Sequence, residues 1–506
     1  MDKSRPLNRI GNNEEPISPL AYRLRPNVRL IEKKGVLQLC LSYPLKYVSL
    51  NPFWREVMDL LSEGDFILFS DILAAVDYQN REKIESFLDD LVRRGFLERT
   101  GMAAMETLPF VSVVIPVYNR PHDMAACLDS LLKLDYPKDK LEVIVVDDAS
   151  TDETPDVVSR YPVKMIMNQK NRQAPYCRNL GAARARGDIL AFIDSDCLAD
   201  RTWLGELVPA FKDPKIAAVG GIVESYYDTR PLDRYEQVRS SLKMGLWPKR
   251  SASNNPFFYV PSCNLLVRRE VFMPTGGFNE SLVVGEDVDL CWRMRDSGWH
   301  IDYLPAGRVF HKHRNRVAAF CKRRFDYGTS EPLLNRLYPE KNKQMVFAPW
   351  ASLFWIVFLA AVLFNAVWLL LFPGAVLLGE SIFKFNHLRQ KGFDISLGRV
   401  AVSLGRSYVA LFYHCCAFFS RYYLIWSFII FPILPVPAII LAGMHLLNGL
   451  VEYALKKPKL DMARFLAFFT MEQLSYQLGV WWQCLKLFSF NAVNPRITKP
   501  QDVRIP

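Results

Sequence analysis

The sequence predicts an α/β catalytic domain between a small α+β domain and an apolar helical region. Between residues 106 and 340, short apolar runs alternate with helical periodicity, which is typical of a mostly parallel sheet. Three acidic clusters follow in order, Asp147-Asp148, Asp194-Ser195-Asp196 and Glu286-Asp287. From Val346 to Gly379 there is no charge, which is long enough for a membrane-spanning helix. We therefore expect three domains, residues 1–105, 106–340 and 341–506.

Bulk composition narrows the class of protein. Ten cysteines are scattered without a CxxC pair, which indicates buried thiols in a reducing compartment rather than structural zinc. Residues 1–19 are polar, so we expect no secretory signal and a cytosolic catalytic domain. The net charge is +11, and much of it lies beside apolar segments, for example Arg314, Arg316, Lys322 and Lys456. This placement favours a membrane rich in anionic lipid over nucleic acid.

The N-terminal domain begins with extended runs around residues 28–31, 36–41 and 46–50. Three helices follow: Asn51 and Pro52 start the first, and the third runs from about Arg81 to Arg94. This order is typical of a winged-helix-like module. The third helix carries four basic and four acidic residues, and its zero net charge argues against DNA binding.

Three segments of this domain, Leu24–Leu30, Val48–Asn51 and Phe87–Leu97, resemble the PqqD-like domains of ribosomal peptide pathways. The resemblance implies that a peptide binds as an added strand at an open sheet edge. A packing domain that only stabilises the enzyme is the alternative.

The catalytic domain opens with a strand at 111–117, an amphipathic helix containing Cys127 and Leu128, and a strand at 141–146 that ends at Asp147-Asp148. A helix over about 174–185 and a strand over 189–193 follow, and the strand delivers Asp194-Ser195-Asp196. Ligands of open α/β sheets bind at such carboxyl ends. Alternate residues of an extended segment share a side, so we expect both aspartates to face one hard divalent cation.

Five segments now identify a family resemblance: VSVVIPVYNR, EVIVVDDASTDET, CRNLGAARARGDILAFIDSDC, GGFNESL and GEDVDLCWRMRDSGWHIDYLP. Over about 108–331 the chain resembles family 2 glycosyltransferases, which have the GT-A fold. The resemblance implies an inverting transfer from a nucleotide-sugar, with Mg²⁺ or Mn²⁺ at the leaving diphosphate.

The resemblance also implies donor-site roles. Asp148 contacts the base, Arg178 lies near the uridine or diphosphate, Asp194 lies near the ribose and metal, and Asp196 ligates the metal. The remaining residues line the nucleotide pocket: Pro116, Tyr118 and Asn119.

Asp287 is our candidate for the base that deprotonates the acceptor hydroxyl, because inversion by single displacement needs one such group. Apolar neighbours such as Leu290 and Trp292 would raise its pKa toward neutrality. The alternative is that Glu286, Asp287 and Asp289 only cap the helix at 288–295.

Three more residues near the end of this domain bear on function. His311 and His313 follow an extended run, and alternation places them on one side, where His311 can complete the metal site. Arg324 matches the arginine of the QxxRW element of processive synthases, but Cys321 and Phe325 replace its glutamine and tryptophan. Long-chain processivity is therefore not expected, and short-chain elongation stays open.

The C-terminal region is expected to associate with a membrane. The run from Val346 to Gly379 suits one tilted span or a hairpin broken at Pro373-Gly374. Lys384, Arg389 and Arg399 then favour a cytosolic loop, and the stretch 462–490 is amphipathic enough to lie on the surface. A soluble helical bundle is the alternative.

The three-part combination resembles the family of glycosyltransferases that act in mycofactocin biosynthesis. This implies UDP-glucose as donor and a peptide-derived redox cofactor as acceptor, with membrane lipid as a further partner and no nucleic acid. Two alternatives stay open: a glycosyltransferase of cell-wall or lipid-linked polysaccharide, and a non-catalytic scaffold.

Overall fold

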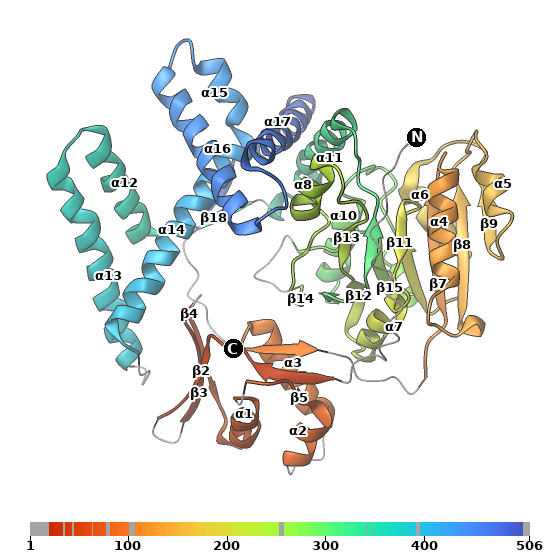
Figure 1. The fold of residues 1–506 in the computed structure, drawn as a ribbon, viewed down its shortest axis with the longest axis horizontal. Coiled ribbons are helices and arrows are strands. Elements are labelled where there is room, and N and C mark those ends of the chain that lie inside the picture. The colour runs from red at the N-terminus through yellow and green to blue at the C-terminus, as the bar shows by residue number, and fades with distance from the viewer. Residues whose placement is uncertain are drawn as a thin grey trace. The chain divides into compact units, whose positions relative to one another are not determined.

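An eight-stranded mixed sheet forms the centre of residues 107–341 (Figure 1). In this computed structural model the neighbouring strands β10, β7, β8 and β9 are parallel, whereas β15 runs antiparallel to both β10 and β12. The predicted strands at 111–117, 141–146 and 189–193 are confirmed. In spatial order the strands are β14 (Lys249–Arg250), β16 (His300–Tyr303), β12 (Ile216–Gly220), β15 (Asn264–Arg268), β10 (Ile189–Ile193), β7 (Val111–Val117), β8 (Leu141–Asp147) and β9 (Lys164–Met167).

The structure describes residues 20–33, 36–42, 45–62, 64–76, 81–100, 107–251, 258–341, 343–346, 348–390 and 395–498. The chain divides into two compact units, each described by itself. Of the described residues, the first comprises those within 107–341 and 449–490. The second comprises those within 20–100, 343–448 and 491–498.

Two apolar cores cover the two faces of the sheet because its central strands are buried on both sides. One core contains residues of α4 (Pro121–Leu132) and α7 (Trp203–Leu207). The other contains residues of α6 (Gln173–Ala183) and α10 (Glu286–Asp296). Shorter helices complete this part: α5 (Thr154–Val158) and α9 (Arg269–Phe272).

A second, three-stranded sheet adjoins the ends of these strands. It has the order β11 (Cys197–Ala199), β17 (Val309–His311) and β13 (Val223–Ser225). Cys197 is the register partner of His311. This pairing brings the second acidic cluster next to a histidine more than a hundred positions later in the sequence.

Three helices pack together in the first unit: α8 (Pro231–Arg239), α11 (Val317–Leu337) and α17 (Met462–Leu487) (Figure 1). Gly328 of α11 and Gly479 of α17 lie at the crossing. A Cβ added to Gly479 would stand 2.1 Å from the carbonyl oxygen of Phe325. The two backbones therefore approach as closely as glycine alone allows.

The N-terminal part of the second unit holds two small sheets. One contains β1 (Ala21–Leu24), β5 (Ile67–Leu68) and β6 (Leu97–Thr100); the other contains β2 (Val28–Lys33), β3 (Val36–Ser42) and β4 (Leu45–Leu50). The three predicted strands and three helices are present, and the Asn51 side chain accepts a hydrogen bond from Phe53 N at 3.0 Å. The helices are α1 (Arg55–Leu61), α2 (Phe69–Ala75) and α3 (Arg81–Arg94).

The second unit also contains most of the apolar helices. Two stretches of the described chain, Val367–Gln390 and Pro435–Lys456, are long and apolar enough to cross a membrane. The chain turns at 364–366, where Asn365 has φ 49°, so the expected break at Pro373 is wrong. Pro373 lies in the first turn of α13, where a missing N–H costs nothing. The helices are α12 (Pro349–Leu363), α13 (Leu371–Gln390), α14 (Leu397–Tyr422), α15 (Leu424–Ile430) and α16 (Pro435–Lys456), whose residues from Gly449 onward belong to the first unit.

Candidate active site

The second acidic cluster lies in a tight turn between β10 and β11. Cys197 N donates to Asp194 O at 3.0 Å, so the expected extended alternation of Asp194 and Asp196 is wrong. A turn separates the two carboxylates, and each has its own partners. Asp194 contacts the α6 side of the site, whereas Asp196 contacts β17.

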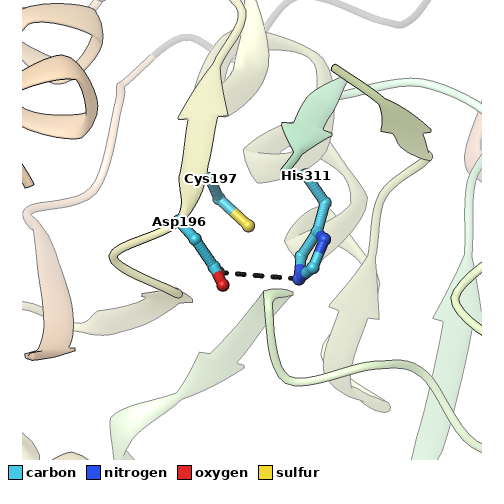
Figure 2. A group of neighbouring side chains, drawn as sticks. All are labelled: Asp196, Cys197 and His311. Carbon is cyan, nitrogen blue, oxygen red and sulfur yellow. Dashed lines mark ion pairs between the residues drawn. The ribbon is translucent and has the colours of Figure 1, made fainter. Parts of the chain in front are cut away.

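Asp196 and His311 face each other across the small sheet (Figure 2). His311 Nε2 lies 3.5 Å from Asp196 Oδ1, and with the sulfur of Cys197 their ligand atoms lie within 4.8 Å of one another. Burial and the adjacent Cys263 raise the pKa of the Cys197 thiol well above its ordinary value. A neutral thiol is a poor ligand for a hard cation, so carboxylate oxygen and imidazole nitrogen are the fitting donors for Mn²⁺ or Mg²⁺.

Two arginines surround Asp196. Arg120 Nη1 lies 3.3 Å and Arg314 Nη1 3.4 Å from its Oδ2 atom. Lys312 lies next to them and pairs with Asp123 at 2.9 Å. The position of Arg314 beside apolar segments predicted a membrane surface, but the fold places this side chain at the acidic cluster. Arg314 lies only three residues after His311, which ends a predicted strand, and this short spacing could have indicated that Arg314 belongs to the site.

Arg178 joins the second and third acidic clusters. Its buried guanidinium donates to Asp194 Oδ1 at 2.6 Å and to Glu286 Oε1 at 2.9 Å. Burial alone would raise the pKa of Asp194, but the charge and hydrogen bond of Arg178 lower it below the ordinary value. Asp194 is therefore an anion at neutral pH.

Asp287 lies at the start of α10 and is partly buried. It accepts hydrogen bonds from Val288 N at 2.8 Å and Ser262 N at 3.4 Å. Burial first, and the charge of Glu286 second, raise the pKa of Asp287 to about 7. Trp292, expected to supply apolar surroundings, packs in a cluster with Leu282 and Leu334 instead.

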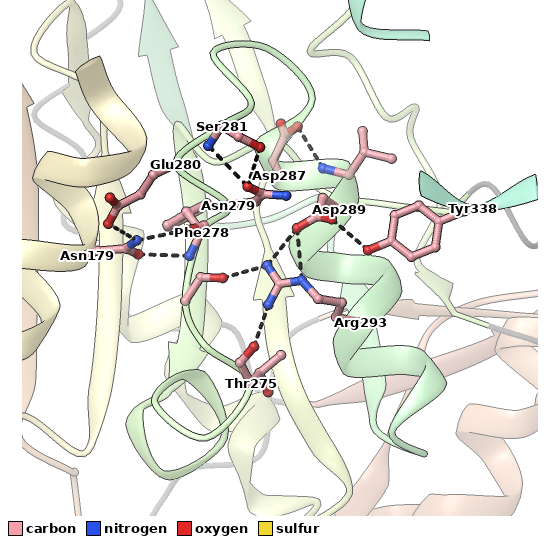
Figure 3. A network of polar contacts seen from close by, with 12 residues as sticks. Asn179, Thr275, Phe278, Asn279, Glu280, Ser281, Asp287, Asp289, Arg293 and Tyr338 are labelled. Atoms are coloured by element: carbon pink, nitrogen blue, oxygen red, sulfur yellow. Dashed lines mark hydrogen bonds and ion pairs between the residues drawn. The ribbon is translucent and has the colours of Figure 1, made fainter. Parts of the chain in front are cut away.

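Asp289, two residues further along α10, belongs to a different network (Figure 3). Arg293 contacts it at 2.9 and 2.7 Å, and Tyr338 donates to its other oxygen at 2.6 Å. Arg293 also donates to the carbonyl of Gly277. Asp289 therefore ties the 275–281 loop and the end of α11 to the helix that carries Asp287.

The first acidic cluster is held by backbone groups. Asp147 accepts from Ser150 N at 3.0 Å. Asp148 accepts from Asn168 Nδ2 at 2.9 Å and from the backbone N–H of Arg172 and Gln173 at 2.8 Å each. Asp148 thus fixes the start of α6, the helix of Arg178.

The residues predicted for the nucleotide pocket follow β7. Pro116 lies inside the strand in register with Val146, and Tyr118 is 45% exposed. Asn119 has φ 50°, and its side chain accepts from Thr151 N at 2.8 Å. These contacts join the two loops at the carboxyl ends of β7 and β8, beside the first acidic cluster.

His313 and Arg324 lie deeper in the protein. The His313 and His311 rings stand 4.7 Å apart, so the predicted proximity of the two imidazoles is confirmed. Burial, and then the nearby His311, lower the pKa of His313 well below its ordinary value. Arg324 is buried and pairs with Glu236 at 2.8 Å.

Comparison with known proteins agrees with this geometry. Residues 112–274 match the family model described as Glycosyl transferase family 2. The chain is 34% identical over 251 residues to "Pre-mycofactocin glycosyltransferase" of Mycobacterium tuberculosis, covering 49% of this chain and 52% of the relative. The chain thus spans about half the length of these curated relatives.

Two further similarities concern other glycosyltransferases. "Glycosyltransferase AglE" of Haloferax volcanii is 33% identical over 204 residues, which cover 39% of this chain and 65% of the relative. A solved mannosyltransferase from Pyrobaculum calidifontis, in complex with GDP-Man and Mn²⁺, has 23% identity and a TM-score of 0.38. That comparison covers 60% of this chain and 81% of the solved chain.

Proposed function

The chain carries a family 2 glycosyltransferase domain, and from this we propose that the protein is a metal-dependent, inverting glycosyltransferase associated with a membrane. The observation that carries the proposal is the arrangement of three carboxylates with different charge states. Asp194 and Asp196 lie at one turn with basic partners, whereas the pKa of Asp287 is raised to about 7. Arg178 and Glu286 connect the two sides.

Asp196 and His311 are proposed to hold the divalent cation, which would stabilise the charge developing on the leaving diphosphate. Arg120 and Arg314 are within reach of the same place. They would bind phosphate oxygens when the cation takes their present position at Asp196. Tyr118, Asn119 and Asp148 are proposed to contact the nucleoside.

Asp287 is proposed to accept the proton of the acceptor hydroxyl as that oxygen attacks the anomeric carbon. A base works best when its pKa is near the working pH, and a value of about 7 meets that condition. Its backbone hydrogen bonds from Val288 and Ser262 orient the carboxylate without neutralising it. The helix-capping alternative and the catalytic role are therefore compatible.

The donor and acceptor are proposed from similarity. The mycobacterial relatives are described as pre-mycofactocin glycosyltransferases, which supports a peptide-derived redox cofactor as acceptor and UDP-glucose as donor. The strands and helices of residues 20–100 suit a PqqD-like domain that receives the peptide at a sheet edge. The domain limits 1–105, 106–340 and 341–506 are part of this proposal.

The two long apolar helices support membrane association. We place the catalytic domain on the cytoplasmic side because Lys384 and Arg389 lie toward the end of α13 and Arg399 lies in the first turn of α14.

The test is a transfer assay with the full chain, Mn²⁺ and UDP-glucose. One series contains the peptide-derived cofactor precursor, and the other contains a lipid-linked glycan acceptor. Transfer to the first acceptor supports the proposal, whereas transfer only to the second assigns the protein to polysaccharide synthesis. Absence of both transfer and slow donor hydrolysis, with a range of nucleotide-sugars, would favour a non-catalytic scaffold.

A further inference from the structure

Helix α17 buries polar as well as apolar side chains, and its exposed side carries large apolar groups. Its buried residues include Glu472, Gln473 and Gln477, which are 5%, 2% and 0% exposed. Its exposed residues include Met471, Leu478, Trp482 and Leu485, called here the outer face of α17. A helix that turns amides and a carboxylate inward and large apolar groups outward is typical of a lipid environment.

The buried side of α17 is fixed to the first unit by charge pairs. Glu472 accepts a hydrogen bond from the Tyr235 hydroxyl and lies 3.4 Å from Arg239 Nη2. Arg239 also pairs with Glu452 at 2.8 Å. Separating these buried partners would leave unpaired charges, so α17 cannot rotate to hide its outer face.

The close backbone crossing between α17 and α11 imposes the same orientation. Only glycine fits at Gly479 and Gly328, so this side of α17 must face α11. The outer face then follows from helical geometry, since residues 471, 478, 482 and 485 recur at helical spacing on one side. The exposed Phe488 continues it where the helix ends.

The amphipathic sequence of residues 462–490 predicted a helix on a membrane surface, but average hydropathy does not show which of its side chains would face the lipid. Among the described helices, α17 is outside the set that is long and apolar enough to cross a membrane, because its inward polar residues lower the average. The helix has 26 residues, or about 39 Å. Its apolar surface is one-sided, which suits a helix lying in the membrane interface rather than one surrounded by lipid.

The charges at the two ends of α17 indicate which lipids it meets. Lys456, Lys457, Lys459 and Arg464 are exposed before and in its first turn. At the other end, Lys486 lies 4.9 Å from the Trp482 ring. Tryptophan and lysine together are typical of the headgroup level, and clustered basic residues attract anionic lipid.

We propose that the outer face of α17 is a bilayer-binding surface of the catalytic unit, lying at the boundary between headgroups and acyl chains of a membrane rich in anionic lipid. This contact is separate from the two long apolar helices, Val367–Gln390 and Pro435–Lys456. It goes beyond glycosyl transfer and does not depend on the donor or acceptor.

The experiment places a photo-crosslinking amino acid at one position of the full chain, reconstituted in vesicles containing phosphatidylglycerol. Trp482 and Leu485 are the test positions. Leu132, which is exposed on α4 of the same unit, is the matched control. After irradiation, mass spectrometry identifies the partner, and an unchanged thermal unfolding midpoint in detergent shows that each variant is folded.

We expect lipid adducts at Trp482 and Leu485, at least fivefold above the control. Cross-links to residues 342–448 would instead show that the second unit covers this face, and a covalent dimer would show a second copy; either overturns the proposal. Adduct yield should also fall at least twofold in pure phosphatidylcholine. An equal adduct yield in both lipids would overturn the inference that this surface prefers anionic lipid.

Discussion

At the residue scale, Asp287 and Asp289 show how two carboxylates of one motif acquire different roles. Asp289 is neutralised by Arg293 and bound by Tyr338. Burial and the charge of Glu286 raise the pKa of Asp287 to about 7, although two backbone N–H groups and Arg178 act in the opposite direction. A network in which every acceptor has a partner stabilises structure, whereas a carboxylate of near-neutral pKa is available for proton transfer.

Asp287→Asn should reduce the rate of transfer by about 10²–10⁴-fold, because general-base catalysis contributes this much. Donor affinity should change little. In the wild-type protein the rate should fall as pH drops below about 7, since the protonated carboxyl cannot accept a proton. Steady-state kinetics with donor titration checks both effects, with Asp139→Asn, an exposed carboxylate of the same unit, as control. A variant that keeps its rate would remove Asp287 from catalysis.

Asp287→Asn should also change stability with pH. Because the folded-state pKa is raised, the protonated form favours folding, and this contribution is lost as pH rises from about 4 to 7. The asparagine side chain of the variant carries no charge, so its burial does not become less favourable as pH rises. The unfolding midpoint of the variant relative to wild type should therefore be several degrees higher at pH 8 than at pH 5. A constant difference across this range would show that the carboxyl is not perturbed.

Asp196→Ala and His311→Ala should weaken metal-dependent donor binding. Loss of one ligand should raise the Mn²⁺ concentration for half-maximal donor binding by at least roughly 10-fold. Mutation of residues that only orient metal ligands already lowers metal affinity by about 10–100-fold. Calorimetric titration of the nucleotide at graded Mn²⁺ measures this shift. His122→Ala, an exposed histidine of the same unit, is the control. An unchanged metal requirement in His311→Ala would limit the site to the carboxylate.

At the element scale, α11 and α17 act as one packed pair although they are far apart in sequence. The crossing at Gly328 and Gly479 allows their backbones to touch. Glu472 and Arg239 then connect α17 to α8, whose Glu236 pairs with Arg324 of α11. Residues 449–490 are therefore part of the first unit, together with the eight-stranded sheet.

Gly479→Ala should lower the free energy of unfolding by about 1–3 kcal/mol, the usual cost of overpacking. The added Cβ would stand 2.1 Å from the Phe325 carbonyl oxygen. Gly405→Ala is the control, because its Cβ would meet nothing within 4 Å, and alanine favours the helix by up to about 1 kcal/mol. Thermal unfolding in detergent should therefore move in opposite directions for the two variants. A stable Gly479→Ala would contradict the close crossing.

At the scale of the whole molecule, two kinds of membrane contact are expected. The stretches Val367–Gln390 and Pro435–Lys456 are suited to crossing a bilayer, whereas α17 is suited to lying on one. Crossing helices leave a membrane only with detergent, but an interfacial helix is released when electrostatic attraction is removed.

The full chain should accordingly stay in the membrane pellet after washing with high salt and alkaline carbonate. Detergent should release it. Sedimentation followed by immunoblotting checks this, with a known integral and a known peripheral membrane protein as references. Recovery in the carbonate supernatant would show that the apolar helices do not span.

The sheet of residues 106–340 and the order of the acidic clusters could be predicted from the sequence. Buried strands such as Val111–Val117 are continuous apolar runs, and ligand groups follow strand ends, so both signals are local. The N-terminal strands and helices were predicted for the same reason. The turn at Asp194-Ser195-Asp196 was not, since one backbone hydrogen bond distinguishes it from an extended segment.

Only the tertiary structure decided which distant residues meet. Arg314 at Asp196, Arg178 between Asp194 and Glu286, and Glu472 on Tyr235 are pairings across long stretches of chain. Charge type can be seen in a sequence, but a pKa depends on burial and on the nearest charge, and both arise only on folding. The same reason applies to α17, because composition gives the average of a helix and packing decides which face meets the solvent.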